Sequence, residues 1–457
     1  MWHVCDERGN TYSYSPAKVF GHARPLFSHR LVELAETDDF ASACKKTIGL
    51  ATAKLFTGGG LECENEQRQR YNYLTVIALR YPVVPLDHGV ADTLVASHMA
   101  TLLAVDKERT FLKCHYIPEP ILAEAACQNM RDDAKFARAI EYLEKWLRTL
   151  YVGSIAQKGE MGELIASIAL SRAYDMAVIA NENEYFSNPV TVRSFVEALT
   201  GIKPKDKDDA ASLAFGGVLS FTKWHQTGEY LKNDKEVLRR AFETRTGICC
   251  RPGEKSVDMV IPTMTMTNGE WRVSAIFVQV KNWSEPLGEA DLQNIQESID
   301  ARAAGILGDA NYMGIVMSVG GGGVKVNMQK KASKASGMGN AHASSTLLQG
   351  CRLYDCAFKR NGGVSVRQVG LIVPRIDALP ETLFSAKIKR ILNGVAGGID
   401  HFERTFKELY QKEHIKILEL FLEAVNHVDK ADLRRAVAGI DNGEAVVKHM
   451  IGMSVKK

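Results

Sequence analysis

The sequence lacks the features that mark membrane and secreted proteins. No uninterrupted apolar run approaches the roughly 18–20 residues that span a bilayer. The N-terminal residues 1–8 lack the apolar core of a signal peptide. We therefore expect an intracellular protein, in the nucleus or the cytoplasm, with no membrane partner.

Several motifs of common enzyme classes are also missing. The nine cysteines include no C-x-x-C pair and no Cys/His tetrad at zinc spacing, so we expect reduced core thiols. There is no G-x-x-x-x-G-K-[ST] phosphate loop, no G-x-S-x-G elbow and no H-E-x-x-H pair. These absences argue against a P-loop ATPase, an elbow-type serine hydrolase and a zinc protease of the H-E-x-x-H type.

The composition is that of a globular protein. The chain has 457 residues, of which 46% are hydrophobic and 24% charged. This length predicts roughly two to four domains. The net charge of +3, from 57 basic and 54 acidic residues, neither favours nor excludes nucleic acid, because only the local distribution of charge matters.

The hydrophobic pattern divides the chain into three regions. We predict a helical N-terminal region over 1–150, where segments such as 91–103 carry apolar residues at helical spacing. Residues 151–375 mix helix and strand signals, with a helical insertion at about 176–245. Residues 376–457 are predicted to be helical again.

The most informative stretch is a predicted hairpin around Asn268-Gly269, the strongest short turn signal for paired strands. If these two residues form the loop, Asp258 lies directly across from Gln279. Lys281 then points to the same face of the sheet. The second strand is apolar on both faces, which predicts a central, covered strand. Three polar residues there are costly unless they share a ligand or network, and the simpler alternative is a salt bridge between Lys281 and Asp258.

Upstream, residues 159–170 predict a helix with an apolar stripe. Glu160 and Glu163 lie on the flank of that stripe. Gly162 would let the helix approach a sheet closely. The simpler alternative is that two glutamates at a helix start only complement the helix dipole.

Together these patterns resemble a known superfamily. A helix with G-x-x-x-E, an Asp on one strand, Q-x-K on the next, a helix and a further strand resemble PD-(D/E)xK nucleases. The strings KGEMGELIASIALSRAYD, SVDMVIP and IFVQVKN resemble the nuclease module of Crinkler-type proteins, and LVASHMATLL and EPILAEAA upstream resemble the linker region that precedes this module. The resemblance covers about residues 85–375. The resemblance implies an α/β, restriction-endonuclease-like core, in which a helix, a mixed sheet of about four strands and a second helix are flanked by helical regions.

The resemblance also implies metal-dependent phosphodiester hydrolysis of DNA, with RNA as the alternative. Asp258 would anchor Mg²⁺ or Mn²⁺, with Glu163 and the amide oxygen of Gln279 as further ligands. Lys281 would supply positive charge near the reacting phosphate. We favour Glu163 over Glu160 because it occupies the last position of G-x-x-x-E.

Two departures from the family pattern matter. Gln279 stands where the family usually has a carboxylate, which removes one anionic ligand and predicts weak metal binding. The ATPase module found upstream in larger relatives is missing. A catalytically inactive protein that binds nucleic acid or another protein is therefore the alternative function.

A basic stretch follows the predicted site. Residues 310–354 contain no Asp or Glu. This stretch is a candidate surface for a nucleic-acid backbone, and the alternative is a solvated loop. Trp283 is placed either to stack on a base or to cap the sheet. The predicted nucleic-acid contacts are Trp283, Lys325, Lys330, Lys331 and Lys334, with Arg352 also basic. The helical regions are candidate surfaces for self-association or a protein partner.

Overall fold

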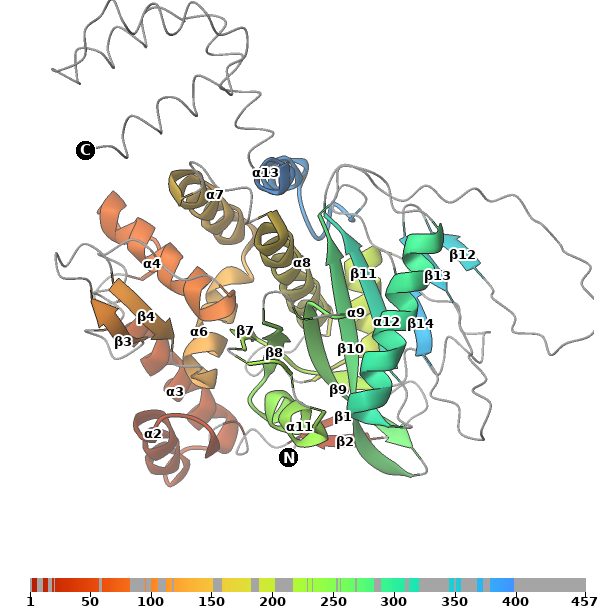
Figure 1. Cartoon of the computed structure of the whole chain (residues 1–457). Helices are drawn as coiled ribbons and strands as arrows, with labels where there is room; N and C mark the ends of the chain where they lie inside the picture. The colour runs from red at the N-terminus through yellow and green to blue at the C-terminus, as the bar shows by residue number, and fades with distance from the viewer. Residues whose placement is uncertain are drawn as a thin grey trace, which may run out of the picture. The chain divides into compact units, whose positions relative to one another are not determined.

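Helices and strands are interspersed along the chain, so the structure is of the mixed α/β class (Figure 1). The computed structural model describes residues 2–5, 11–14, 19, 21–56, 60–82, 95, 100–105, 112–116, 119–150, 158–181, 189–201, 217–227, 229–231, 233–251, 254, 256–267, 269–282, 289–308, 312–319, 345–348, 351–354, 368–372 and 379–397. The helices are α2 (Pro25–Ala35), α3 (Phe40–Leu55), α4 (Glu66–Arg80), α6 (Pro120–Met130), α7 (Asp133–Leu150), α8 (Lys158–Ala180), α9 (Val192–Thr200), α11 (Lys235–Glu243), α12 (Glu289–Leu307) and α13 (Ala386–Gly397).

The strands form one large mixed sheet and two small hairpins. In the ten-stranded sheet the order is β12-β13-β14-β11-β10-β9-β6-β5, and β8 pairs with both β9 and β7. Strands β8, β9 and β10 run antiparallel in succession, and β11 joins β10 in parallel after the chain passes through α12. The strands are β1 (Trp2–Cys5), β2 (Thr11–Tyr14), β3 (Ala100–Val105), β4 (Leu112–Tyr116), β5 (Val190–Thr191), β6 (Val218–Leu219), β7 (Lys223–Gln226), β8 (Thr246–Cys249), β9 (Met259–Thr267), β10 (Glu270–Lys281), β11 (Tyr312–Ser318), β12 (Ser345–Leu348), β13 (Cys351–Tyr354) and β14 (Gln368–Ile372).

The β9–β10 hairpin has the register that the sequence predicts. Its pairs run from Thr267 opposite Glu270 to Met259 opposite Val278. Gly269 has φ of +79°, in the left-handed region that glycine adopts without strain. β10 lies between β9 and β11, which confirms the prediction of a central strand.

Helices cover both faces of this central part of the sheet. Ile276 and Val278 share a hydrophobic core with α8, whereas Ala275 and Phe277 share a second core with α11 and α12. Figure 1 shows α8 and α12 on opposite sides of the sheet. Because successive side chains of a strand point to opposite faces, Gln279 and Lys281 continue the α12 face.

Close packing of α8 on β10 depends on Gly162. A Cβ atom at this position would lie 3.0 Å from Asn282 Cβ and 3.2 Å from Val280 Cγ1. This is tighter than ordinary van der Waals contact, so a side chain at this position would require Val280, Asn282 or the helix to shift. The expected role of Gly162 is thus confirmed.

Buried ion pairs connect the N-terminal helices to α8 and the sheet. Arg80 of α4 donates two hydrogen bonds to Asp175 of α8, at 2.8 and 3.0 Å. Arg245, just before β8, donates to Glu124 of α6 at 2.6 Å, and the side chains of all four residues are at most 1% exposed. Buried charges of this kind persist only when they are paired, so these contacts set the position of α8 relative to α4 and of the start of β8 relative to α6.

The hydrophobic core is continuous across residue 150, joining α3, α4, α6 and α7 to α8 and β10. By their contacts, Met1–Ala396 form one compact unit and Gly397–Lys457 a second. The three-part domain division remains a prediction.

Some segments differ from the local expectation. Residues 100–105, predicted to be helical, form β3 and pair with β4. A short apolar run does not distinguish helix from strand, and the strand partner decides. The N-terminal region also contains the β1–β2 hairpin, and the insertion predicted at about 176–245 contains β5, β6 and β7 as well as helices. Of the predicted C-terminal helical region, residues 398–457 lie outside the described residues.

The structure also bears on the expectations for membrane spans and for the cysteines. Among the described residues, no helix combines the length and apolarity needed to cross a membrane. Cys44, Cys127, Cys249 and Cys250 are buried free thiols.

Two glycines on the first turns of α8 offer a matched test of the packing. Gly162→Ala should destabilise the protein by about 1–3 kcal/mol, because the new methyl group overpacks the contact with Val280 and Asn282. Gly159→Ala meets nothing within 4 Å and should be neutral or stabilising by about 0.5–1 kcal/mol. Urea denaturation of both variants measures the difference, and equal effects would contradict the close approach of α8 to β10.

Candidate functional site

Asp258 lies at the start of β9 and is held by the adjoining strand. Its N–H donates to the carbonyl oxygen of Val278 at 3.0 Å, although Val278 is the register partner of Met259, so the regular β9–β10 ladder ends at Met259. Its Oδ2 atom accepts hydrogen bonds from Gln279 Nε2 at 2.5 Å and from the N–H of Val280 at 2.6 Å. Asp258 and Gln279 are thus in contact at the open end of the hairpin, whereas the paired register itself ends at Met259 and Val278.

Glu163 approaches Asp258 from the first turns of α8. It is partly buried, whereas Glu160 is exposed. Burial, and then the negative charges of Asp258 and Glu160, raise the pKa of Glu163 from 4.5 to about 8. Because a carboxylate raises the pKa of another only when the two lie close together, Glu163 and Asp258 belong to one electrostatic site.

The charge of Lys281 acts on the same carboxylate. Burial raises the pKa of Asp258, while the N–H of Val280, the charge of Lys281 and the amide of Gln279 lower it in that order of size. Lys281 is partly exposed at the end of β10. The structure therefore brings Glu163, Asp258, Gln279 and Lys281 to one end of the β9–β10 hairpin.

The residues of the site come from both faces of the sheet. Gln279 and Lys281 face α12, whereas α8 covers the opposite face and contributes Glu163. A partly buried carboxylate whose pKa is raised by a neighbouring carboxylate, as that of Glu163 is by Asp258, is stabilised in its charged form by a nearby cation.

The donor atoms fit a hard divalent cation. Carboxylate and amide oxygens are the ligands that Mg²⁺ and Mn²⁺ prefer. Across the part of the chain that the structure describes, no group of three His, Cys, Asp or Glu side chains is arranged to hold a metal ion. A metal at this site would therefore rely on two carboxylates, Glu163 and Asp258, supplemented by the amide oxygen of Gln279 and by water.

The predicted nucleic-acid contacts are not part of the described structure. Trp283, Lys325, Lys330, Lys331 and Lys334 lie outside the described residues. Arg352 falls in β13, which pairs with β12 and β14. These contacts remain predictions.

Two buried residues beside the carboxylates had no signal as site residues in the sequence. Cys249 of β8 has its thiol pKa raised by burial and by the charges of Glu163 and Asp258, so it lies beneath the site as a neutral thiol. Asn282 is buried against Gly162 of α8. In the sequence Asn282 is distinguished only by following Q-x-K directly.

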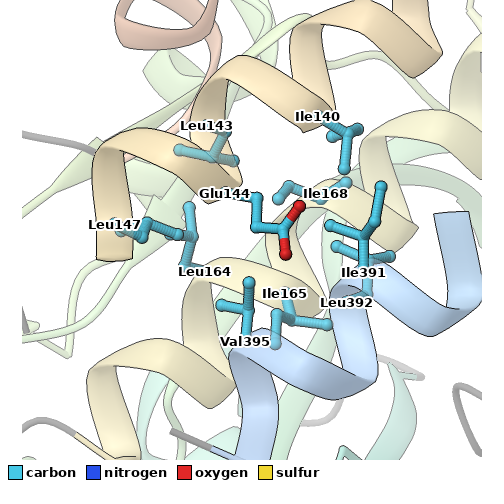
Figure 2. A pocket seen from close by; sticks show the side chains of 10 residues that line it. All are labelled: Ile140, Leu143, Glu144, Leu147, Leu164, Ile165, Ile168, Ile391, Leu392 and Val395. Atoms are coloured by element: carbon cyan, nitrogen blue, oxygen red, sulfur yellow. The ribbon is translucent and has the colours of Figure 1, made fainter. Parts of the chain in front are cut away.

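A small pocket lies on the other side of α8, between α7, α8 and α13 (Figure 2). Its described lining is apolar except for Glu144, and it includes Leu164 and Ile165 of α8. Figure 2 shows the Glu144 carboxylate among these apolar side chains. Neither Glu163 nor Asp258 is among its lining residues, so the pocket is separate from the candidate site.

Comparison with known proteins adds a family of unknown function. Residues 73–300 match a family model described as Domain of unknown function (DUF8736). The matched range begins in α4 and ends in α12, so it includes all four residues of the candidate site. No curated protein matches the chain, and no solved structure matches it.

The raised pKa of Glu163 predicts how stability depends on pH without metal. Between about pH 4.5 and 8 the folded protein holds a proton on Glu163 that the unfolded chain releases. This contribution to stability is present below pH 4.5 and is lost as the pH rises through about 8. Glu163→Gln stays uncharged, so the free energy of unfolding of wild type relative to this variant should fall over that range.

Urea denaturation in EDTA at several pH values measures this difference. Glu36→Gln, at the exposed C-terminal cap of α2, serves as the control. If the difference in the free energy of unfolding between wild type and Glu163→Gln does not change with pH, the raised pKa of Glu163 is contradicted.

Proposed function

We propose that the chain hydrolyses phosphodiester bonds of nucleic acid in a reaction that depends on Mg²⁺ or Mn²⁺. The observation that carries the proposal is the proximity of Glu163 to Asp258. Burial, and then the charges of Asp258 and Glu160, raise the pKa of Glu163 to about 8, and the charge of Lys281 acts on Asp258. Partly buried carboxylates and a cationic side chain at one sheet end are the groups that such hydrolysis requires. DNA is the favoured substrate, with RNA as the alternative.

Each residue has a definite part in the proposed reaction. Asp258 and Glu163 hold the cation, and Gln279 supports Asp258 through its amide N–H while its oxygen is a further donor. When bound, the divalent ion would neutralise the phosphate and make water more acidic. Lys281 places positive charge where negative charge develops on the phosphate during attack.

The topology supports the same proposal. A helix that carries Glu163, three antiparallel strands β8, β9 and β10, the helix α12 and the parallel strand β11 follow in the order implied by the resemblance to PD-(D/E)xK nucleases. The resemblance to the restriction-endonuclease-like core is part of the proposal, and Crinkler-type proteins remain the suggested relatives.

A specific contact favours the second candidate, an inactive protein that binds nucleic acid or another protein. Oδ2 of Asp258 is already occupied by hydrogen bonds from Gln279 and Val280. A glutamate in place of Gln279 would instead repel Asp258 and favour a cation between them. The inactive protein would bind nucleic acid with a steep salt dependence but would cleave none.

Cleavage assays distinguish the two candidates. Purified protein with Mg²⁺ or Mn²⁺ should cut supercoiled plasmid, single-stranded DNA or RNA. Asp258→Ala removes the anchoring carboxylate, and Lys281→Ala removes the charge that stabilises the transition state. Each should lower the cleavage rate by about 10²–10³-fold.

Glu160→Gln and Glu163→Gln form a matched pair on one helix turn. We expect Glu160→Gln, at an exposed position, to keep the wild-type cleavage rate. Glu163→Gln, at the partly buried position, should lower that rate. Equal activity of the wild type and Asp258→Ala on every substrate would overturn the proposed hydrolysis and favour the inactive protein.

A further inference from the structure

An exposed tyrosine and an arginine form a stacked pair on the surface. Tyr230 is 58% exposed, which is high for an aromatic side chain. The guanidinium carbon of Arg251 lies 5.1 Å from the centre of its ring. This distance is typical of a cation–π contact.

The segments that carry Tyr230 and Arg251 are held in place by a partly buried ion pair. Arg302 of α12 donates to Glu254 at 2.6 Å and also to the carbonyl oxygen of Leu231. The other carboxylate oxygen of Glu254 accepts from the N–H of Leu231 at 3.1 Å. Both backbone groups of the residue after Tyr230 are therefore engaged, and the ring is presented on a restrained backbone.

Chain connections put this pair at the same end of the sheet as Asp258. The segment that carries Tyr230 leaves β7 at Thr227, whose N–H donates to the carbonyl oxygen of Cys249 at 2.9 Å. Arg251 follows Cys250, whose N–H donates to the carbonyl oxygen of Asp258 at 2.8 Å. Both segments thus emerge where β9 begins.

Electrostatics agree with this placement. Burial raises the pKa of the Cys250 thiol, and the charges of Glu254, Asp258 and Arg302 all act on it. The side chain of Cys250 thus lies close both to the Glu254–Arg302 ion pair, which holds the segments of Tyr230 and Arg251, and to Asp258 of the candidate site. Because Arg302 belongs to α12, the pair stands on the face to which Gln279 and Lys281 point.

We propose that Tyr230 and Arg251 form a platform that stacks an unpaired base of single-stranded nucleic acid beside the candidate site. The inference rests on the proposed function and adds a substrate class to it. Aromatic rings and guanidinium planes stack on every base, so the platform needs a base that is free of a duplex. The guanidinium N–H groups of Arg251 can at the same time donate to the adjoining phosphate.

Binding without cleavage tests the platform separately from the chemistry. In EDTA, fluorescence anisotropy measures the affinity of the full chain for labelled oligothymidylate and oligouridylate of about 16 nucleotides and for a duplex of similar length. Tyr230→Ala should weaken single-strand binding by roughly 5- to 150-fold and leave duplex binding unchanged. Tyr230→Phe should keep wild-type affinity, as should Phe40→Ala, a control at an exposed aromatic residue of α3.

The role of the arginine is read from salt dependence. Arg251→Ala should weaken binding and reduce the slope of log affinity against log salt by about 0.7, the value for one phosphate contact on a single strand. Tyr230→Ala should leave this slope unchanged, because stacking releases no counterions.

A spectroscopic measurement on the wild type needs no variant. The fluorescence of 2-aminopurine within the bound single strand should be quenched by stacking on the platform. Wild-type affinity of Tyr230→Ala for both single strands, or no quenching of 2-aminopurine, would overturn the platform. The cleavage assay with wild type and Asp258→Ala tests the proposed hydrolysis independently of binding. Failure of the platform can therefore be distinguished from failure of the proposed hydrolysis.

Discussion

The contact between α8 and β10 at Gly162 is the constraint on which the candidate site depends. A missing side chain lets the helix lie against Val280 and Asn282, and the next residue along the helix is Glu163. Farther along α8, Asp175 is held by Arg80 in a buried pair, so the helix is restrained at both ends. Glu163 thereby reaches Asp258 although α8 and the side chains of Gln279 and Lys281 lie on opposite faces of the sheet.

Two hydrogen bonds from β10 satisfy the carboxylate of Asp258 at the start of β9. Asp258 accepts them from the side chain of Gln279 and from the N–H of Val280. Burial and neighbouring negative charge keep Glu163 protonated at neutral pH, with a pKa of about 8. A cation would replace that proton, so cation binding and deprotonation of Glu163 are coupled.

The hairpin and its polar residues could be predicted because their signals are local. Asn268-Gly269 predicts the turn, the turn predicts the register down to Met259 and Val278, and the next residues, Asp258 and Gln279, are in contact. The Arg80–Asp175 pair and the Tyr230–Arg251 stack join segments far apart in sequence, and no local pattern marks them. Strand β3 shows the same limit, since its partner β4 overrides the helical spacing of its apolar residues.

A double-mutant cycle of Mn²⁺ affinity measures whether Glu163 and Asp258 hold one divalent cation. Electron paramagnetic resonance would measure free Mn²⁺ in titrations of the wild type, Glu163→Gln, Asp258→Asn and the double variant. Shared coordination predicts that each single change weakens Mn²⁺ binding and that the effects are not additive, because the two carboxylates act on one ion. Mn²⁺ affinity that neither change alters would contradict the account.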